Sequence, residues 1–182
     1  MFKKSRLIIW AIIAVLILLL FLAMLFADEV QWNEVIAYGL LLSAIGGFYE
    51  LGRWLKTCQG AYRFAFGFGF TSVLFLGWVS GAIGIIGSEN NPANLMYGAV
   101  FVAWIIGSLI SRFRSRGMAW TFLVMAFIQM SVPIFALFVW PAQASWGEAG
   151  VIGVLVFNSI FVGLFVSTAL LFRRASARLR AK

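Results

Sequence analysis

Histidine is absent from the 182-residue chain, aspartate occurs only as Asp28 and cysteine only as Cys58. The absence of histidine excludes His-ligated haem, zinc sites that use histidine, and Ser-His or Cys-His nucleophile pairs. A single aspartate cannot supply the paired carboxylates of an aspartic protease, and the chain has no phosphate-binding loop that ends in Gly-Lys-Ser/Thr. The sequence therefore predicts no catalytic residue, no cofactor and no metal ligand, and we expect a protein that is not an enzyme.

Charge is also scarce. Charged residues make up 11% of the chain and hydrophobic residues 63%, whereas an ordinary soluble domain is about a quarter charged. The net charge of +8 comes from basic residues in short clusters between apolar runs. Such clusters are typical of membrane topology signals, so we expect a lipid bilayer around the protein and no nucleic-acid partner.

Six apolar runs are long enough to be membrane spans. The first is too long for the short apolar core of a cleaved signal peptide, so we interpret it as a signal anchor. The second is among the shortest, because Gly46, Gly47 and Glu50 interrupt it. The expected fold is all-α, a single transmembrane helical bundle over residues 1–182. Its spans lie near residues 7–27, 35–51, 64–86, 95–110, 118–140 and 150–172.

The basic residues alternate with the acidic ones along these runs. Both chain ends and every second loop carry Lys or Arg, whereas the intervening loops carry Asp28, Glu29, Glu34, Glu89 and Glu148 without any basic residue. The positive-inside rule then places both termini in the cytoplasm of a bacterial-type inner, or plasma, membrane. We also expect the basic segment 173–182 to bind anionic lipid headgroups. The basic clusters are Lys3, Lys4 and Arg6; Arg53, Lys56 and Arg63; Arg112, Arg114 and Arg116; and Arg173, Arg174, Arg178, Arg180 and Lys182.

Three polar residues inside the spans are candidates for function. An ionisable residue within a span, here Glu50, suggests a proton or cation relay. An ion pair with Arg53 near the membrane surface explains it without a function, and we favour this explanation. Gln129 lies one turn before Pro133, and Asn158 lies near the middle of the last span. We expect the side chain of Gln129 to bond to backbone carbonyls that Pro133 leaves free. For Asn158 we expect hydrogen bonds between helices, with contact to a solute as the alternative.

Glycines give the third span a small-residue face. Gly77, Gly81 and Gly84 are spaced i, i+4 and i+7, which places them on one side of a helix. Such a face allows close approach of another helix, either inside the bundle or in a second copy.

The outer segment between the third and fourth spans is the most distinctive stretch. Gly87 is suited to end one helix, and Asn91 followed by Pro92 is suited to begin the next. Glu89, Asn90 and Asn94 remain, and with Asp28 and Glu29 they form either an acidic outer mouth with a weak cation site or a solvated loop.

Four segments resemble a family of small multi-span bacterial inner-membrane proteins of unknown activity. The most specific is the outer loop IIGSENNPANLMY at 85–97, and the others are ADEVQW at 27–32, YEL at 49–51 and RFRSRGMA at 112–119. The resemblance covers nearly the whole chain and implies a multi-span inner-membrane protein, without catalytic residues to carry over. It singles out Glu89, Asn91 and Asn94 for mutation.

Two functions fit these features. The first is a non-catalytic protein that acts by association, either as an accessory subunit with other membrane proteins or as a homo-oligomer, because few ionisable groups lie in its spans. The alternative is a small channel or transporter for an ion or polar solute. Its path would pass Glu89, Asn90 and Asp28 outside, Gln129 and Asn158 midway, and Glu50 inside.

Overall fold

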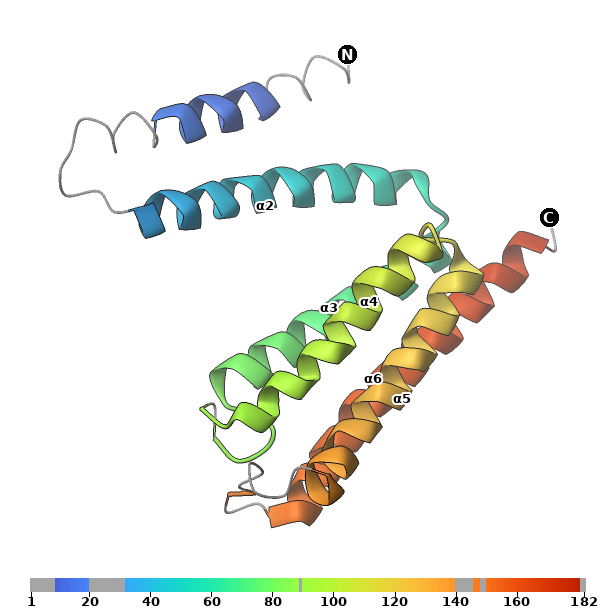
Figure 1. Ribbon diagram of the computed structural model, residues 1–182. Coiled ribbons are helices and arrows are strands. Elements are labelled where there is room, and N and C mark those ends of the chain that lie inside the picture. Colours follow the sequence, from blue (N-terminus) through green and yellow to red (C-terminus); the bar gives the residue numbers. More distant parts are fainter. Residues whose placement is uncertain (1–8, 20–31, 89, 140–145, 148–149, 181–182) are drawn as a thin grey trace. The chain divides into compact units, whose positions relative to one another are not determined.

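The computed structural model describes residues 9–19, 32–88, 90–139, 146–147 and 150–180. Within these ranges the chain is helical, with turns between the helices and no strand. It divides into two compact units, residues 1–58 and residues 59–182, and each is described by itself (Figure 1). The expected single domain therefore stays a prediction.

The first unit contains a short helix, Ile9–Leu19, and the helix α2, Trp32–Thr57. α2 continues through Gly46, Gly47 and Glu50, which were expected to interrupt the span. Gly46 is where the two helices meet, since a Cβ added there would lie 2.8 Å from Ile13 Cδ1. A side chain at this position would have to displace the short helix or its side chains.

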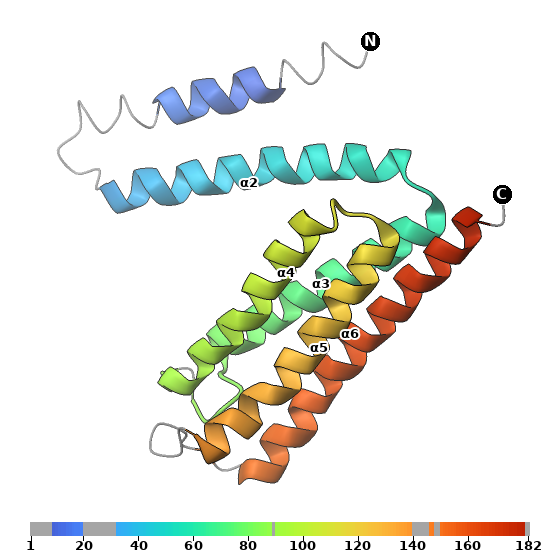
Figure 2. The ribbon, with the colours of Figure 1, turned by 45° about the vertical axis from the view of Figure 1, so that its right-hand side comes forward.

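The second unit consists of four long helical segments that run side by side (Figures 1 and 2). α5 packs against both α4 and α6, and α3 packs against α6. A short 3-10 helix, η1, leads directly into α4. The elements are α3 Gly60–Ala82, η1 Pro92–Tyr97, α4 Gly98–Ile110, α5 Ser115–Phe138 and α6 Gly150–Arg180.

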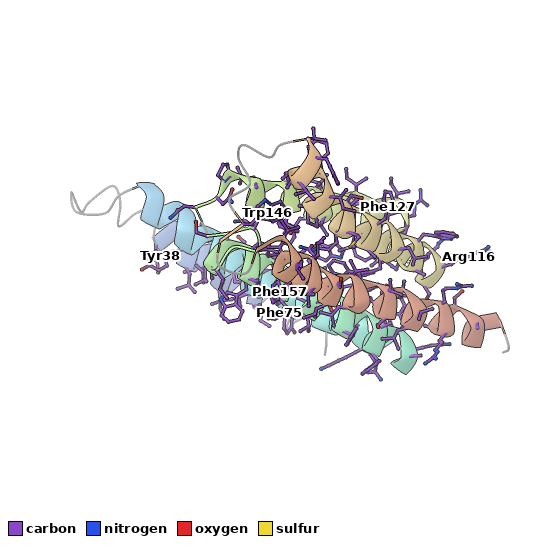
Figure 3. All side chains as sticks on the ribbon, turned by 90° about the horizontal axis from the view of Figure 1, so that it is seen from below. Tyr38, Phe75, Arg116, Phe127, Trp146 and Phe157 are labelled. Carbon is purple, nitrogen blue, oxygen red and sulfur yellow. The ribbon has the colours of Figure 1, made fainter. Side chains whose placement is uncertain are left out.

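All four segments of the second unit are long and apolar enough to cross a membrane: Gly60–Ala82, Pro92–Ile110, Ser115–Phe138 and Gly150–Ala177. The helix Ile9–Leu19 is apolar but shorter. Large apolar side chains also point outward, among them Phe127, which is 75% exposed (Figure 3). Lipid is the solvent that suits such a surface. The expected class, an all-α membrane protein with a helical bundle, is confirmed.

The end of α3 differs from the expectation. The helix ends at Ala82, and Gly84 follows it with a φ of +77° while its N–H bonds to the carbonyl of Val79. A left-handed residue just after a helix is a common C-terminal signal, and glycine adopts it without strain. The predictions that Gly87 ends this helix and that Gly84 shares a helical face with Gly77 and Gly81 are therefore wrong. Residues 83–86 continue the apolar run beyond Ala82, so the hydropathy pattern does not indicate that the helix ends there.

Candidate functional site

The two amides in the middle of the bundle belong to one buried hydrogen-bonded chain. Gln129 Nε2 of α5 donates to Asn158 Oδ1 of α6 at 2.8 Å, and Asn158 Nδ2 donates to the hydroxyl of Tyr97 at 2.7 Å. All three side chains have 0% exposure. The hydrogen bond between α5 and α6 confirms the expected role of Asn158 in joining helices. Gln129, which was expected to bond to a backbone carbonyl freed by Pro133, is its partner instead.

Pro133 changes the backbone hydrogen bonding of α5 next to Gln129. Pro133 has no N–H to donate to the carbonyl of Gln129, so the helix lacks one backbone bond there. Ser131 Oγ donates to the carbonyl of Phe127 at 2.8 Å in the preceding turn. Gln129 Oε1 is buried without a hydrogen-bond partner. The row of hydrogen-bonded side chains therefore ends at Gln129 Oε1, an acceptor that no donor contacts.

Tyr97 is the member that the sequence analysis missed. It is the last residue of η1 and follows the outer loop directly. Its aromatic ring reads as an apolar or interfacial residue, and only the tertiary structure brings its hydroxyl to Asn158. The signal available in the sequence was its place at the end of the IIGSENNPANLMY segment.

The outer loop is organised by Asn94, which is 8% exposed. Its Oδ1 accepts from the backbone N–H groups of Ile85 and Ile86 at 3.0 and 2.9 Å, and its Nδ2 donates to the carbonyl of Ser88 at 2.8 Å. These contacts satisfy backbone groups of the loop that follows α3. Because both amide atoms serve the loop, Asn94 has a structural role here.

Asn91 begins η1 as expected. Its side chain accepts from the N–H of Ala93 at 3.0 Å, and Pro92 occupies the start of the helix. Asn90 is exposed. The other expected members of an outer cation site, Glu89, Asp28 and Glu29, lie outside the described residues.

A groove opens beside this loop, between α3 and the η1–α4 segment. Its volume is about 510 Å³, and Ser80, Asn90 and Tyr97 are among its lining residues. Ser80 Oγ is buried without a hydrogen-bond partner. The groove therefore extends from the exposed Asn90 to Tyr97, whose hydroxyl belongs to the buried chain.

Glu50 contacts the short helix of the first unit. Trp10 Nε1 donates to Glu50 Oε1 at 3.1 Å, one turn beyond the close approach at Gly46. The guanidinium group of Arg53 lies 5.8 Å from the centroid of the Tyr49 ring. The Glu50–Arg53 ion pair stays a prediction.

The opposite end of the 59–182 unit is built from the start of α3, the α4–α5 turn and the end of α6. Tyr62 of α3 donates its hydroxyl proton to the carbonyl of Phe113 in the turn at 2.6 Å. The turn has a left-handed backbone at Arg112 and Phe113, with φ of +48° and +56°. It reverses the chain so that α5 starts beside the last turns of α6 (Figure 2).

Aromatic rings and a glycine hold this end together. Phe172 of α6 lies 5.4 Å from Tyr62 and 5.8 Å from Phe122, between ring centroids. A Cβ added at Gly69 of α3 would lie 2.5 Å from Thr168 Cγ2 and 2.6 Å from Phe122 Cζ. Helices α3, α5 and α6 thus meet at a position that accepts only glycine without rearrangement.

The described residues contain no group of three or more His, Cys, Asp or Glu side chains that could hold a metal ion. Their arrangement defines a class, a helical membrane bundle with buried, hydrogen-bonded polar side chains in its middle. Comparison of the chain with family models, with curated proteins and with solved structures finds no match.

Proposed function

We propose that this chain is a non-catalytic integral protein of a bacterial-type inner membrane and acts by association. It serves either as an accessory subunit of a larger membrane complex or as a structural homo-oligomer. In this proposal the chain crosses the membrane six times, and the helix Ile9–Leu19 and α2 belong to the first two crossings. The resemblance to small multi-span inner-membrane proteins supports the same interpretation.

The distribution of basic residues supports the orientation. Arg63 follows Tyr62 at the start of α3, Arg112 and Arg114 lie in the α4–α5 turn, and Arg173 lies near the end of α6. The hydrogen bond from Tyr62 to the turn joins the first two places, and a shared cavity joins the turn region to α6. Positive-inside orientation makes this end cytoplasmic, and with six crossings both termini lie on that side.

The burial of the hydrogen-bonded chain of Gln129, Asn158 and Tyr97 is the observation that carries the choice of association over transport. A conduction path needs polar groups that a passing ion or solute can reach. Gln129 and Asn158, the proposed midway groups, instead bond to each other and to Tyr97 with 0% exposure. Their hydrogen-bonding capacity is therefore spent largely on joining η1, α5 and α6.

The test is the mass of the intact assembly. The tagged chain is extracted from its native membrane in mild detergent and weighed by native mass spectrometry. We expect a reproducible complex with other polypeptides, which makes the protein an accessory subunit. A closed homo-oligomer would instead favour the channel candidate and make flux the next measurement. A lone monomer that persists across several mild detergents would contradict the proposal.

The second candidate, a channel or transporter, is favoured by the groove between α3 and η1–α4. Its lining by Asn90, Ser80 and Tyr97 gives a polar solute a way from the loop end to the buried chain. Flux into liposomes should then fall in Asn158→Leu and in Tyr97→Phe, and in Glu50→Gln if the path continues through the first unit. Absent flux in the wild type, or equal flux in Asn158→Leu, would dismiss this candidate.

A further inference from the structure

The basic end of the 59–182 unit lacks nearby acidic residues in its own sequence. The only acidic side chains in residues 59–182 are those of Glu89 and Glu148. Their neighbours Ser88 and Gly147 lie in the loops of the opposite end, where Gly147 approaches Gly87. Trp146 and Arg116 accordingly appear toward opposite ends in Figure 3.

The start of α5 adds to this excess of positive charge. Arg114 is the N-cap residue and makes no side-chain capping bond, Arg116 lies in the first turn, and that turn contains no acidic residue. The N-terminus of a helix carries a partial positive charge and favours anions over cations. An anion bound beside Arg114 and Arg116 would therefore reduce the electrostatic repulsion among the arginines and the N-terminus of α5.

A cavity with a volume of about 270 Å³ lies at this place, between α5 and α6. Arg116 and Arg173 line it from the two helices, together with Ser176 and Ala177. Both arginines are exposed, so their guanidinium groups are accessible. Guanidinium groups bind phosphate oxygens in pairs of parallel hydrogen bonds, and a serine hydroxyl adds a further donor.

The helix lengths place this cavity at the level of the lipid headgroups. α5 has 24 residues, about 36 Å at 1.5 Å per residue, which is more than the roughly 30 Å of a hydrocarbon core. The stretch from Gly150 to Phe172 is of similar length, about 34 Å. Arg116 and Arg173 therefore both lie where an apolar span gives way to phosphate groups.

We propose that the cavity between the first turn of α5 and the end of α6 binds the phosphate of one anionic phospholipid, held by Arg116 and Arg173. This assigns a discrete site between Arg116 of α5 and the start of the basic segment 173–182, beyond general attraction of the tail to a charged surface. The inference rests on the membrane location given above but not on the association role.

Lipid binding is measured on the full chain in neutral detergent by native mass spectrometry. Phosphatidylglycerol and phosphatidylcholine with the same acyl chains are titrated separately. We expect one phosphatidylglycerol bound about tenfold more tightly than phosphatidylcholine. Both lipids carry a phosphodiester, but the choline cation offsets its charge and repels the arginines, whereas the glycerol headgroup leaves the negative charge uncompensated. Arg116→Gln and Arg173→Gln should each remove most of this preference.

Arg174→Gln is the matched control. It makes the same change of charge on the adjacent residue of α6, which does not line the cavity, so we expect less than about a twofold effect. An equal loss in Arg174→Gln would overturn the proposal, because binding would then follow total charge. Equal affinity for the two lipids would also overturn it.

Free phosphate is the other source of the same chemistry. A large molar excess of inorganic phosphate should leave the bound phosphatidylglycerol in place, because the acyl chains add to the affinity of the lipid. Displacement of the lipid by phosphate would overturn the assignment to a lipid. Failure in any of these experiments leaves the association proposal standing, since the mass of the native complex tests that separately.

Discussion

The two ends of the 59–182 unit are held together by different interactions. At the loop end, side-chain amides bond to backbone groups. The single side chain of Asn94 bonds to Ile85, Ile86 and Ser88. At the basic end, helices come into close contact through Gly69 and the rings around Phe172. The first end has a long connection after α3, whereas the second has a short turn.

This difference follows from what each end must satisfy. A long connection with buried backbone needs hydrogen-bond partners for its N–H and C=O groups, and asparagine supplies both a donor and an acceptor. A tight turn leaves few such groups, so the helices can be stabilised by packing alone. Substitutions should therefore cost stability for different reasons at the two ends.

The largest loss is expected at the loop end, for Asn94→Ala. The change leaves the buried N–H groups of Ile85 and Ile86 without their acceptor, which should lower the free energy of unfolding by about 2–4 kcal/mol. Asn90→Ala is the control, because Asn90 is exposed and should change stability by less than about 0.5 kcal/mol. Unfolding by SDS in mixed micelles, followed by circular dichroism, measures both. Similar losses in the two variants would refute the role of Asn94.

At the basic end, Gly69→Ala should reduce stability by about 1–3 kcal/mol, because the added methyl group overlaps Thr168 and Phe122. Gly67 lies in the same helix and has open space at its Cβ position. Gly67→Ala should therefore be neutral or gain up to about 1 kcal/mol from helix propensity. The same SDS titration compares them, and equal effects would show that close packing does not stabilise this end.

Between the two ends, Asn158→Leu should lower the free energy of unfolding by about 1–2 kcal/mol, because Gln129 and Tyr97 lose their shared partner. The double variant Asn158→Leu with Gln129→Leu should lose less than the sum of the two single variants. A double-mutant cycle with the same denaturant measures this coupling, for which about 0.6 kcal/mol is typical in membranes. If the stability losses of the two single variants add up to that of the double variant, the hydrogen bonds of Gln129 and Asn158 do not stabilise each other.

The smallest effect is expected for Arg116→Gln at the basic end. This arginine stands in the first turn of α5 without an acidic neighbour there, so its removal should change stability in lipid-free detergent by less than about 0.5 kcal/mol. The measurement is the same unfolding titration, repeated with added phosphatidylglycerol. A large loss without lipid would indicate that Arg116 supports the fold directly.

Much of the fold and part of the candidate site could be predicted from the sequence. The apolar runs predicted the long helices of the second unit, and Asn91 with Pro92 predicted the start of η1. Asn158 was expected to join helices, because a buried amide in lipid needs a partner. Gln129 was expected to bond to a backbone carbonyl instead. Tyr97 could not be predicted as that partner, since its hydroxyl reaches Asn158 across 61 positions of the sequence.

The sequence by itself determined the helical class, the membrane environment and the alternation of basic and acidic segments. These properties depend on local composition, and hydrophobic runs of this length have few alternatives to a spanning helix. Tertiary structure decided where α3 stops, that Asn94 holds the loop, and that Arg116 and Arg173 line one cavity. Each of these depends on contacts between residues far apart in the chain, which hydropathy and spacing do not encode.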